Sequence, residues 1–403
     1  MEYNFEREIP RQGTNSVKWE FEPGGEDEPL VVPSTRFLGE DRALPMWVAD
    51  MDFRCPEPVV EALTARAGHG IYGYSAPTSA FYESVAGWMA RRHAWEISPE
   101  WICVTPGVVP ALNILVRTFV SPGEKVLIQP PVYHPFKMAI ENNQAKVAVN
   151  PLRDADGEYR MDFADLEAKL DDPAVRMAIL CSPHNPVGRV WTRDELAEFG
   201  RICTRNDVLV VSDEIHGDVV YPGRLFTPYA ALGPDFARRS VICTSPSKSF
   251  NLAGLHTSAI IIPDGDLRSR FEKTLSSSGL FGANCFGIIA YQTAYNEGEE
   301  WLEGALRYIE ANLAYLEGYL ISHIPQIRMV RPQGTYLVWL DCRSLGLTSN
   351  ELNHWMQEEA EVYLEDGAIF GPQGEGFQRM NIACPRALLE DALDRIRSAI
   401  ARR

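Results

Sequence analysis

Two residues of this sequence have the types and the spacing of a catalytic pair. Asp213 and Lys248 each stand just after an apolar, β-branched run, in VLVVSDEIHG and VICTSPSKSF. A lysine amine can form a Schiff base with a carbonyl compound. A carboxylate can keep the ring nitrogen of a pyridine cofactor protonated. Together they predict a site for pyridoxal 5'-phosphate, with Lys248 as the catalytic amine.

Two segments offer donors for the phosphate of such a cofactor. Gly107 opens GVVPALNILVRTF, where apolar residues recur at helical spacing and Pro110 falls in the first turn. The amides at a helix start bind phosphate well. Ser245 and Ser247 precede Lys248 and offer hydroxyl groups to the same phosphate. A strand, a glycine and a helix recur in every α/β protein, and the serines also fit a polar turn, so neither segment decides the matter by itself.

Three further side chains complete a candidate site. Asn185, in SPHNPVGRV, could donate to a phenolic ring oxygen, although Asn-Pro is also a common turn dipeptide. Tyr133, in PPVYHPF, could stack on a planar ring or pack beneath its proline-rich loop. Arg379, in GFQRMNIACP, has the planar fork that suits a substrate carboxylate, although a single arginine is usually solvated. The order and spacing of the whole set are what make the prediction restrictive.

The elements that must position these residues belong to an α/β fold. Between residues 101 and 262 short apolar runs alternate with helical patterns, which predicts a mostly parallel sheet covered by helices on both faces. Ligands of such sheets bind beyond the carboxyl ends of the strands, where the candidate residues fall. A long helical pattern, a strand and a closing amphipathic helix then predict a smaller α+β domain. We expect residues 1–48 to contribute to this small domain, 49–285 to form the large cofactor-binding domain, and 286–403 to complete the small one.

Composition and charge restrict the class of protein. The chain has 403 residues, of which 45% are hydrophobic and 23% charged, as in a globular protein of more than one domain. A formal net charge of −17 argues against a nucleic-acid-binding surface. No apolar segment is long enough to span a membrane, and the first twenty residues lack the apolar core of a signal peptide, which predicts a cytoplasmic protein. Eight scattered cysteines without a CxxC pair predict no metal site.

With these residues in place, the sequence resembles the fold-type I pyridoxal-phosphate enzymes of the class I/II aminotransferase family over nearly its full length. Within that family it is most similar to the cystathionine β-lyase, or C-S lyase, branch. The resemblance implies a large domain with a mostly parallel seven-stranded sheet. It rests on five segments: GTNSVKWE at 13–20, PMWVADMDF at 45–53, SPHNPVGRVW at 182–191, SDEIHGDVVY at 212–221 and SKSFNLAGL at 247–255.

The resemblance implies a role for each candidate cofactor-binding residue. Lys248 would form the Schiff base, Asp213 would bind the pyridine nitrogen and Asn185 the ring oxygen, while Tyr133 would stack on the ring. His216, where plain aminotransferases have a tyrosine, is also expected at the cofactor. The residues implied for the phosphate are Gly107, Val108, Ser245 and Ser247.

The resemblance also implies substrate contacts and an assembly. Arg379 would bind the substrate carboxylate with help from the backbone of Ala49. Tyr74 matches a tyrosine that reaches the phosphate site of the neighbouring subunit, which implies a homodimer with shared active sites. One position departs from the pattern, since His256 stands where many members have an arginine that pairs with the phosphate. An imidazole would hold the phosphate dianion less firmly.

The predicted activity is a carbon-sulfur β-lyase of amino-acid metabolism. The lysine amine would remove the Cα proton, and a thiolate would then leave the β-carbon. L-cystathionine or related cysteine S-conjugates would give a thiol, pyruvate and ammonia. The same residues would serve methionine biosynthesis, cysteine breakdown or detoxification of conjugates. An aminotransferase uses the same first half of the reaction, and only the branch segments favour elimination over it. A third interpretation is a non-catalytic regulatory protein on the same fold, against which the intact lysine, aspartate and arginine argue.

Overall fold

The computed structural model of the chain describes residues 3–25, 29–37, 43–280 and 283–403 and divides into two compact units. The larger unit comprises Cys55–Glu303 with Gln333–Thr335. The smaller unit comprises Met1–Arg54, Gly304–Pro332 and Tyr336–Arg403. Helix α11 (Cys285–Glu297) belongs to the larger unit, so this division differs from the predicted limit after residue 285 by about that helix.

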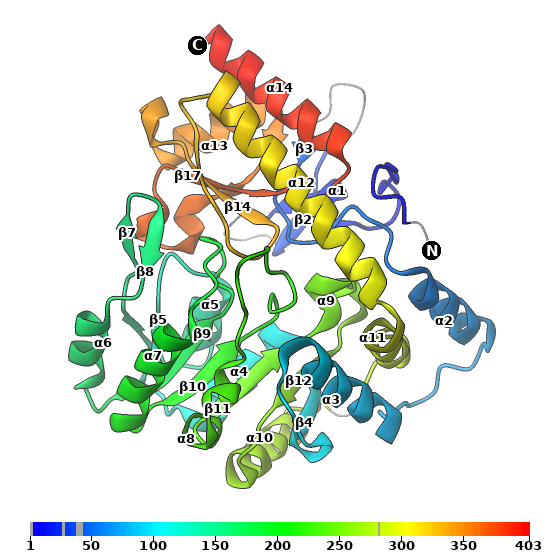
Figure 1. Cartoon of the computed structure of the whole chain (residues 1–403), viewed down its shortest axis with the longest axis vertical. Coiled ribbons are helices and arrows are strands. Elements are labelled where there is room, and N and C mark those ends of the chain that lie inside the picture. Colours follow the sequence, from blue (N-terminus) through cyan, green and yellow to red (C-terminus); the bar gives the residue numbers. More distant parts are fainter. Residues whose placement is uncertain (1–2, 26–28, 38–42, 281–282) are drawn as a thin grey trace. The chain divides into compact units, whose positions relative to one another are not determined.

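A seven-stranded sheet forms the centre of the larger unit (Figure 1). Its strands in spatial order are β4 (Ile102–Thr105), β12 (Ser258–Ile261), β11 (Ser240–Thr244), β10 (Leu209–Asp213), β9 (Val175–Cys181), β5 (Lys125–Ile128) and β6 (Lys146–Val149). Strand β12 is antiparallel to both neighbours, and the other neighbouring pairs are parallel. The predicted mostly parallel sheet is thereby confirmed. Six strands coincide with the predicted apolar runs, and only the half-exposed edge strand β6 had no such run.

Helices cover this sheet because its residues are apolar toward both faces. All five residues of β10 and of β11 are buried. Helix α4 (Val108–Phe119) presents Leu112, Leu115 and Val116 to the same core, at the spacing of one helical face. The other helices of this unit are α2 (Glu57–Gly68), α3 (Ser79–His93), α5 (Pro135–Asn142), α6 (Phe163–Leu170), α7 (Arg193–Arg205), α8 (Pro234–Ala237), α9 (Pro246–Ser249) and α10 (Gly265–Ser277), and a hairpin joins β7 (Arg153–Ala155) to β8 (Glu158–Arg160).

The smaller unit is built on a four-stranded antiparallel sheet, as the α+β prediction requires. Its strands in spatial order are β13 (Arg328–Val330), β14 (Leu337–Asp341), β17 (Phe377–Asn381) and β16 (Glu365–Asp366). Helices α12 (Glu299–His323) and α14 (Arg386–Arg402) run side by side, joined by a hydrogen bond from the Tyr319 hydroxyl to Asp394 (Figure 1). The remaining elements are α1 (Val17–Glu20), α13 (Ser349–Glu358) and the short pairs β1 (Phe21–Pro23) with β2 (Val31–Pro33) and β3 (Leu44–Pro45) with β15 (Val362–Tyr363).

Within the described part of the chain, no helix combines the length and the apolar character that crossing a bilayer would need.

Candidate active site

One edge of the seven-stranded sheet collects the predicted cofactor residues. Strands β4, β5, β9, β10 and β11 point the same way, so their carboxyl ends share this edge, where ligands of α/β sheets bind. A predicted site residue lies at or shortly after the end of each of these strands. In strand order from β4 they are Gly107, Tyr133, Asn185, Asp213 and Lys248.

Asp213 ends β10 as a buried carboxyl that faces the charge of Lys248. Its side chain accepts a hydrogen bond from the Ile215 amide at 3.2 Å. Burial raises the pKa of Asp213 to about 7, against the opposing effects of the Ile215 amide and the Lys248 charge. A cationic partner would stabilise the ionised form of this carboxyl, because it offsets the free-energy cost of placing a charge in the interior.

The neighbouring acid Glu214 is tied into the core instead. Burial raises its pKa to about 8. Its carboxyl accepts from the Ser212 hydroxyl at 2.9 Å and from the Tyr229 amide at 2.8 Å. Successive side chains point in opposite directions at the end of the strand, so Asp213 faces Lys248 while Glu214 is hydrogen-bonded in the core.

Lys248 lies in the single turn of α9, between two anchored serines. Before it, Ser245 caps the turn by accepting from the Ser247 amide at 3.2 Å, and its hydroxyl donates to the Thr257 carbonyl at 2.9 Å. After it, the Ser249 hydroxyl donates to Asp218 at 2.6 Å. Both flanks of the lysine are therefore fixed by hydrogen bonds, which limits the positions that its amine can take.

The sequence alone did not predict Asp218 as part of this arrangement. The Asp218 carboxyl is buried and also accepts from the Trp88 indole at 3.0 Å, while the His93 Nε2 lies 2.8 Å from it. The His93 contacts are the main influence that holds the pKa of Asp218 below its usual value against the effect of burial. Asp218, five residues after the end of β10, gave no local signal, because Trp88 and His93 come from helix α3, far away in the sequence.

The start of α4 supplies amides for an anion. Gly107 is the cap residue, with φ +138, a backbone conformation that residues with a side chain rarely adopt. Pro110 has no N–H group, and the Ala111 amide donates to the Gly107 carbonyl at 3.2 Å. The first-turn amides of Val108 and Val109 therefore remain for a ligand at the positive end of the helix dipole.

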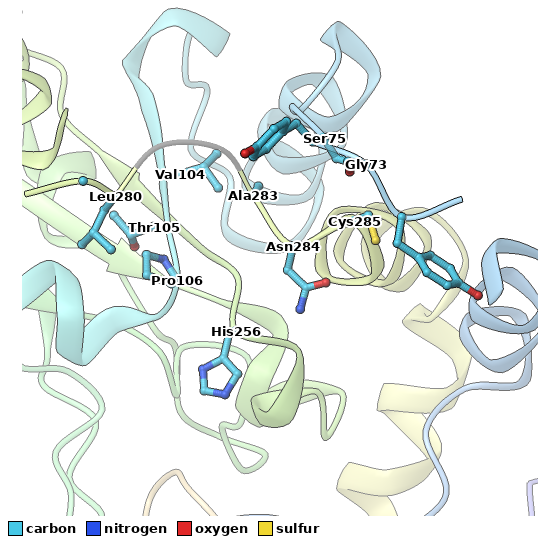
Figure 2. A pocket seen from close by; sticks show the side chains of 13 residues that line it. Gly73, Ser75, Val104, Thr105, Pro106, His256, Leu280, Ala283, Asn284 and Cys285 are labelled. Atoms are coloured by element: carbon cyan, nitrogen blue, oxygen red, sulfur yellow. The ribbon is translucent and has the colours of Figure 1, made fainter. Parts of the chain in front are cut away.

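A pocket of about 660 Å³ opens beside this helix start. Figure 2 shows Thr105 and Pro106, at the end of β4, on one side of it and Asn284 and Cys285, at the start of α11, on the other, with His256 below them. His256 has φ +46 and an exposed side chain. The position that carries an arginine in many members of the resembled family therefore faces this pocket.

The other predicted residues of the larger unit lie as follows. Tyr74 lines the same pocket, and its side chain is fully exposed. Tyr133 is half-buried and packs edge-to-face on Phe136, with ring centroids 5.8 Å apart. Asn185 and His216 are buried, at 4% and 3% exposure. The structure describes these positions, while their roles at a cofactor stay predictions.

The smaller unit holds Arg379 and Ala49 in one hydrogen-bonded frame. The Arg379 guanidinium donates to the Trp47 carbonyl at 2.9 Å. The Tyr336 hydroxyl donates to the Ala49 carbonyl at 2.9 Å. Asn381, two residues after Arg379 on β17, donates to the carbonyls of Val48 and Asp50 at 2.7 and 2.6 Å. Four successive carbonyls, from residue 47 to residue 50, are thus held by two side chains of β17 and by Tyr336, directly before β14.

A buried ion pair holds Asp52, two residues after these four carbonyls. Lys18 is fully buried, and its ammonium lies 2.6 Å from the Asp52 carboxylate. The Trp19 indole donates to the same carboxylate at 2.8 Å, and the Arg11 guanidinium at 3.1 Å. Two of the five branch segments, 13–20 and 45–53, therefore form one structural element.

Comparison with known proteins places this geometry in a family. The model of the family "Aminotransferase class I and II" matches residues 46–396. The chain belongs to this family. Cystathionine beta-lyase PatB of Bacillus subtilis (strain 168) is 46% identical over 398 residues, which cover 99% of this chain and 100% of that protein. Protein MalY of Escherichia coli (strain K12) is 34% identical over 402 residues, which cover 99% of each chain.

Solved structures of the family share the fold of this class I/II member. Cystalysin from Treponema denticola, which contains a pyridoxal 5'-phosphate cofactor, superposes with a TM-score of 0.92 and 35% identity over all of both chains. The PLP-bound putative aminotransferase from Clostridium difficile 630 gives a TM-score of 0.92 and 38% identity, covering 99% of this chain and 100% of that one. The predicted family, branch and fold type are confirmed.

The residues at the sheet edge of this family member fit pyridoxal phosphate. The buried Asp213 suits a protonated ring nitrogen, the amine of Lys248 lies within its electrostatic reach, and the start of α4 suits a phosphate. The Ser245 and Ser247 hydroxyls, 2.7 Å apart, add polar groups next to the lysine. Among the described residues, no cluster of histidine, cysteine or acidic side chains has the arrangement of a metal site.

Proposed function

We propose that the chain is a pyridoxal-phosphate-dependent carbon-sulfur β-lyase that cleaves L-cystathionine or related cysteine S-conjugates to a thiol, pyruvate and ammonia. The geometry at the sheet edge supports the cofactor chemistry but is shared by lyases and aminotransferases. One observation carries the choice of elimination, namely the 46% identity, over essentially both full lengths, with a cystathionine beta-lyase.

The proposed roles follow from where each residue lies. When bound, pyridoxal phosphate withdraws electrons from the α-carbon of the substrate and so makes its proton acidic. Lys248, set between two anchored serines, removes that proton with its side-chain amine. Asp213 keeps a positive charge on the ring nitrogen, and Arg379 orients the substrate carboxylate.

Further residues hold the cofactor in the proposed site. Tyr133 stacks on the ring, and Asn185 donates to its oxygen from the buried loop after β9. His216, buried three residues after Asp213, also contacts the cofactor. The phosphate is bound by Gly107, Val108, Ser245 and Ser247, by the partner's copy of Tyr74, and more weakly by His256.

The direct test is to incubate the purified protein with pyridoxal phosphate and L-cystathionine and to measure pyruvate and free thiol. We expect the two products in equal amounts, because elimination releases one of each. Formation of a keto acid only when an amino acceptor is supplied would replace the lyase assignment with an aminotransferase. A change in cofactor absorbance without either product would mean that the protein binds the amino acid but does not turn it over.

Replacement of Asp213 by asparagine separates the electrostatic effect of the fold from that of the cofactor. The pKa of Asp213 is about 7 in the folded chain and about 3.9 when unfolded. The folded cofactor-free chain therefore holds more protons between these values and loses stability as the pH rises through them. We expect cofactor-free Asp213→Asn to unfold at a higher temperature than the wild type at pH 8, with little difference at pH 4.

Pyridoxal phosphate should raise the unfolding temperature of Asp213→Asn less than that of wild type, because the variant lacks the charge that pairs with the ring nitrogen. Thermal unfolding with and without pyridoxal phosphate at pH 8 measures this gain. Glu214→Gln is the matched control, since burial raises the pKa of Glu214 as well but its hydrogen bonds go to the core. An equal gain from the cofactor in Asp213→Asn and wild type would remove Asp213 from the proposed site.

We also propose that the enzyme is a cytoplasmic homodimer that serves methionine biosynthesis. The fully exposed aromatic ring of Tyr74 supports a partner subunit at that surface. Among the described residues no cysteine forms a disulfide, as is usual in the cytoplasm. Sedimentation equilibrium of the cofactor-loaded protein tests the dimer, and a monomer at micromolar concentration would contradict it.

A further inference from the structure

Arg379 already has an acidic partner in the described structure. Strands β16 and β17 are antiparallel, and their register sets Glu365 directly opposite Arg379. The Glu365 carboxylate lies 2.9 Å from the same guanidinium nitrogen that donates to the Trp47 carbonyl. The two side chains are mutual counter-ions across the strand pair.

Burial makes this pair unlike an ordinary surface ion pair. Arg379 is 3% exposed, and its guanidinium lies over the Phe370 ring at 5.0 Å from the centroid. Burial also raises the pKa of Glu365 against the opposing charge of Arg379. Charges removed from water in this way act on each other, and on any third charge, with much less screening than at the surface.

The same sheet contains a useful contrast. Arg328 and Asp341 also stand directly opposite each other, on β13 and β14, and their side chains are 2.9 Å apart. The Arg328 side chain is 60% exposed, so water and salt screen its charge. The two cross-strand pairs have equal length but differ in the exposure of the arginine. The acid Asp341 is itself buried and also accepts from the Arg343 guanidinium at 2.8 Å.

A substrate carboxylate that reaches Arg379 must share it with Glu365. The guanidinium carries one positive charge, whereas the two carboxylates together carry two negative charges. The excess negative charge opposes substrate binding, and it does so in surroundings where like charges repel strongly. Removal of the Glu365 charge, with the hydrogen-bond acceptor kept, should therefore strengthen the hold of Arg379 on the substrate.

We propose that Glu365 sets the affinity of the site for α-amino-acid substrates, by acting as a resident competitor of the substrate carboxylate for Arg379. This inference rests on the proposed function, in which Arg379 binds that carboxylate. It assigns to Glu365 the tuning of substrate affinity and no direct part in the proton transfer. The substrate carboxylate keeps the same contact in the ground state and the transition state, so this tuning acts on KM rather than on kcat.

The experiment compares cofactor-loaded wild type, Glu365→Gln and the control Asp341→Asn, which removes the acid that pairs with the exposed Arg328 in the same sheet. For Glu365→Gln we expect the KM for L-cystathionine to fall about tenfold, with a much smaller change in kcat. The glutamine oxygen can still accept from Arg379, so the arginine keeps its position. For Asp341→Asn we expect no change in KM. An unchanged or higher KM in Glu365→Gln would overturn the inference.

A binding measurement keeps this test separate from the test of the lyase activity. L-alanine has no group to eliminate, and its dissociation constant can be obtained from the absorbance of the bound cofactor. We expect that constant also to fall about tenfold in Glu365→Gln, but not for the methyl ester of alanine, which lacks the carboxylate. If wild type forms no thiol from cystathionine but the alanine result holds, the proposed function fails and the role of Glu365 stands. If wild type cleaves cystathionine and alanine affinity is unchanged, the role of Glu365 fails alone.

Discussion

Replacing Lys248 with alanine should lower kcat for cystathionine cleavage by about 10⁴-fold or more, because the variant loses both the proton-transferring base and the amine that bonds to the cofactor. The fold should survive, since α9 is held by Ser245 and Ser249 rather than by the lysine. Pyruvate production under saturating substrate measures the effect. Circular dichroism of the variant checks that its structure is intact.

Lys146→Ala provides the matched control for Lys248→Ala. Lys146 is exposed at the start of the edge strand β6, away from the strand ends that collect the site residues. Its loss removes the same number of side-chain atoms and the same charge, and we expect turnover within about twofold of wild type, as for an exposed residue with no special contact. Turnover by Lys248→Ala at the level of this control would dismiss Lys248 as the catalytic amine.

The larger part of the fold followed from local patterns. Strands β9, β10 and β11 are apolar on both faces, so their sequences alone predicted buried parallel strands. Once the strands are parallel, residues directly after them must meet at one edge. The sequence positions of Asp213 and Lys248 therefore predicted that both lie at this edge, Asp213 at the end of β10 and Lys248 in the turn after β11. Strand β6 is half-exposed at the edge of the sheet, so its sequence does not need the apolar run that marks the buried strands.

The supporting contacts could not be predicted in this way. Glu365 opposes Arg379 through the register of two strands, and a register cannot be obtained from one short strand sequence. Asp218 depends on His93 and Trp88, more than a hundred residues earlier. Lysine is almost never fully buried unless paired, so nothing in VKWE indicates that Lys18 lies inside. All three cases depend on tertiary pairing rather than on local periodicity.

Replacing Lys18 with methionine should destabilise the protein by about 3 to 5 kcal/mol, the cost of leaving a buried charge without its partner. Methionine fills similar space, so the loss is mainly electrostatic. Arg11 and Trp19 still contact the Asp52 carboxylate, which places the expected cost at the lower end of that range. Denaturant unfolding of the cofactor-loaded protein, followed by the fluorescence of its tryptophans, measures the change.

The exposed pair of Lys125 and Asp172 gives a control with the same geometry. Its charged atoms are 2.6 Å apart, as in the buried pair, but both side chains are more than one-third exposed. Lys125→Met should cost no more than about 1 kcal/mol, because water solvates the remaining carboxylate. The difference between the two variants isolates the contribution of burial. Equal costs would mean that Asp52 is stabilised by Arg11 and Trp19 alone.

The Lys18 variant also tests whether the two branch segments act as one element. Asp52 follows the four carbonyls that Arg379, Asn381 and Tyr336 hold in place. If Lys18 fixes the far end of that segment, its loss should raise the KM for L-cystathionine at a temperature where the variant is still folded. In the double variant Lys18→Met with Asp52→Leu, the carboxylate that lost its lysine is also removed, which should restore part of the stability. This second replacement should not restore KM, since the segment would then lack the anchor itself.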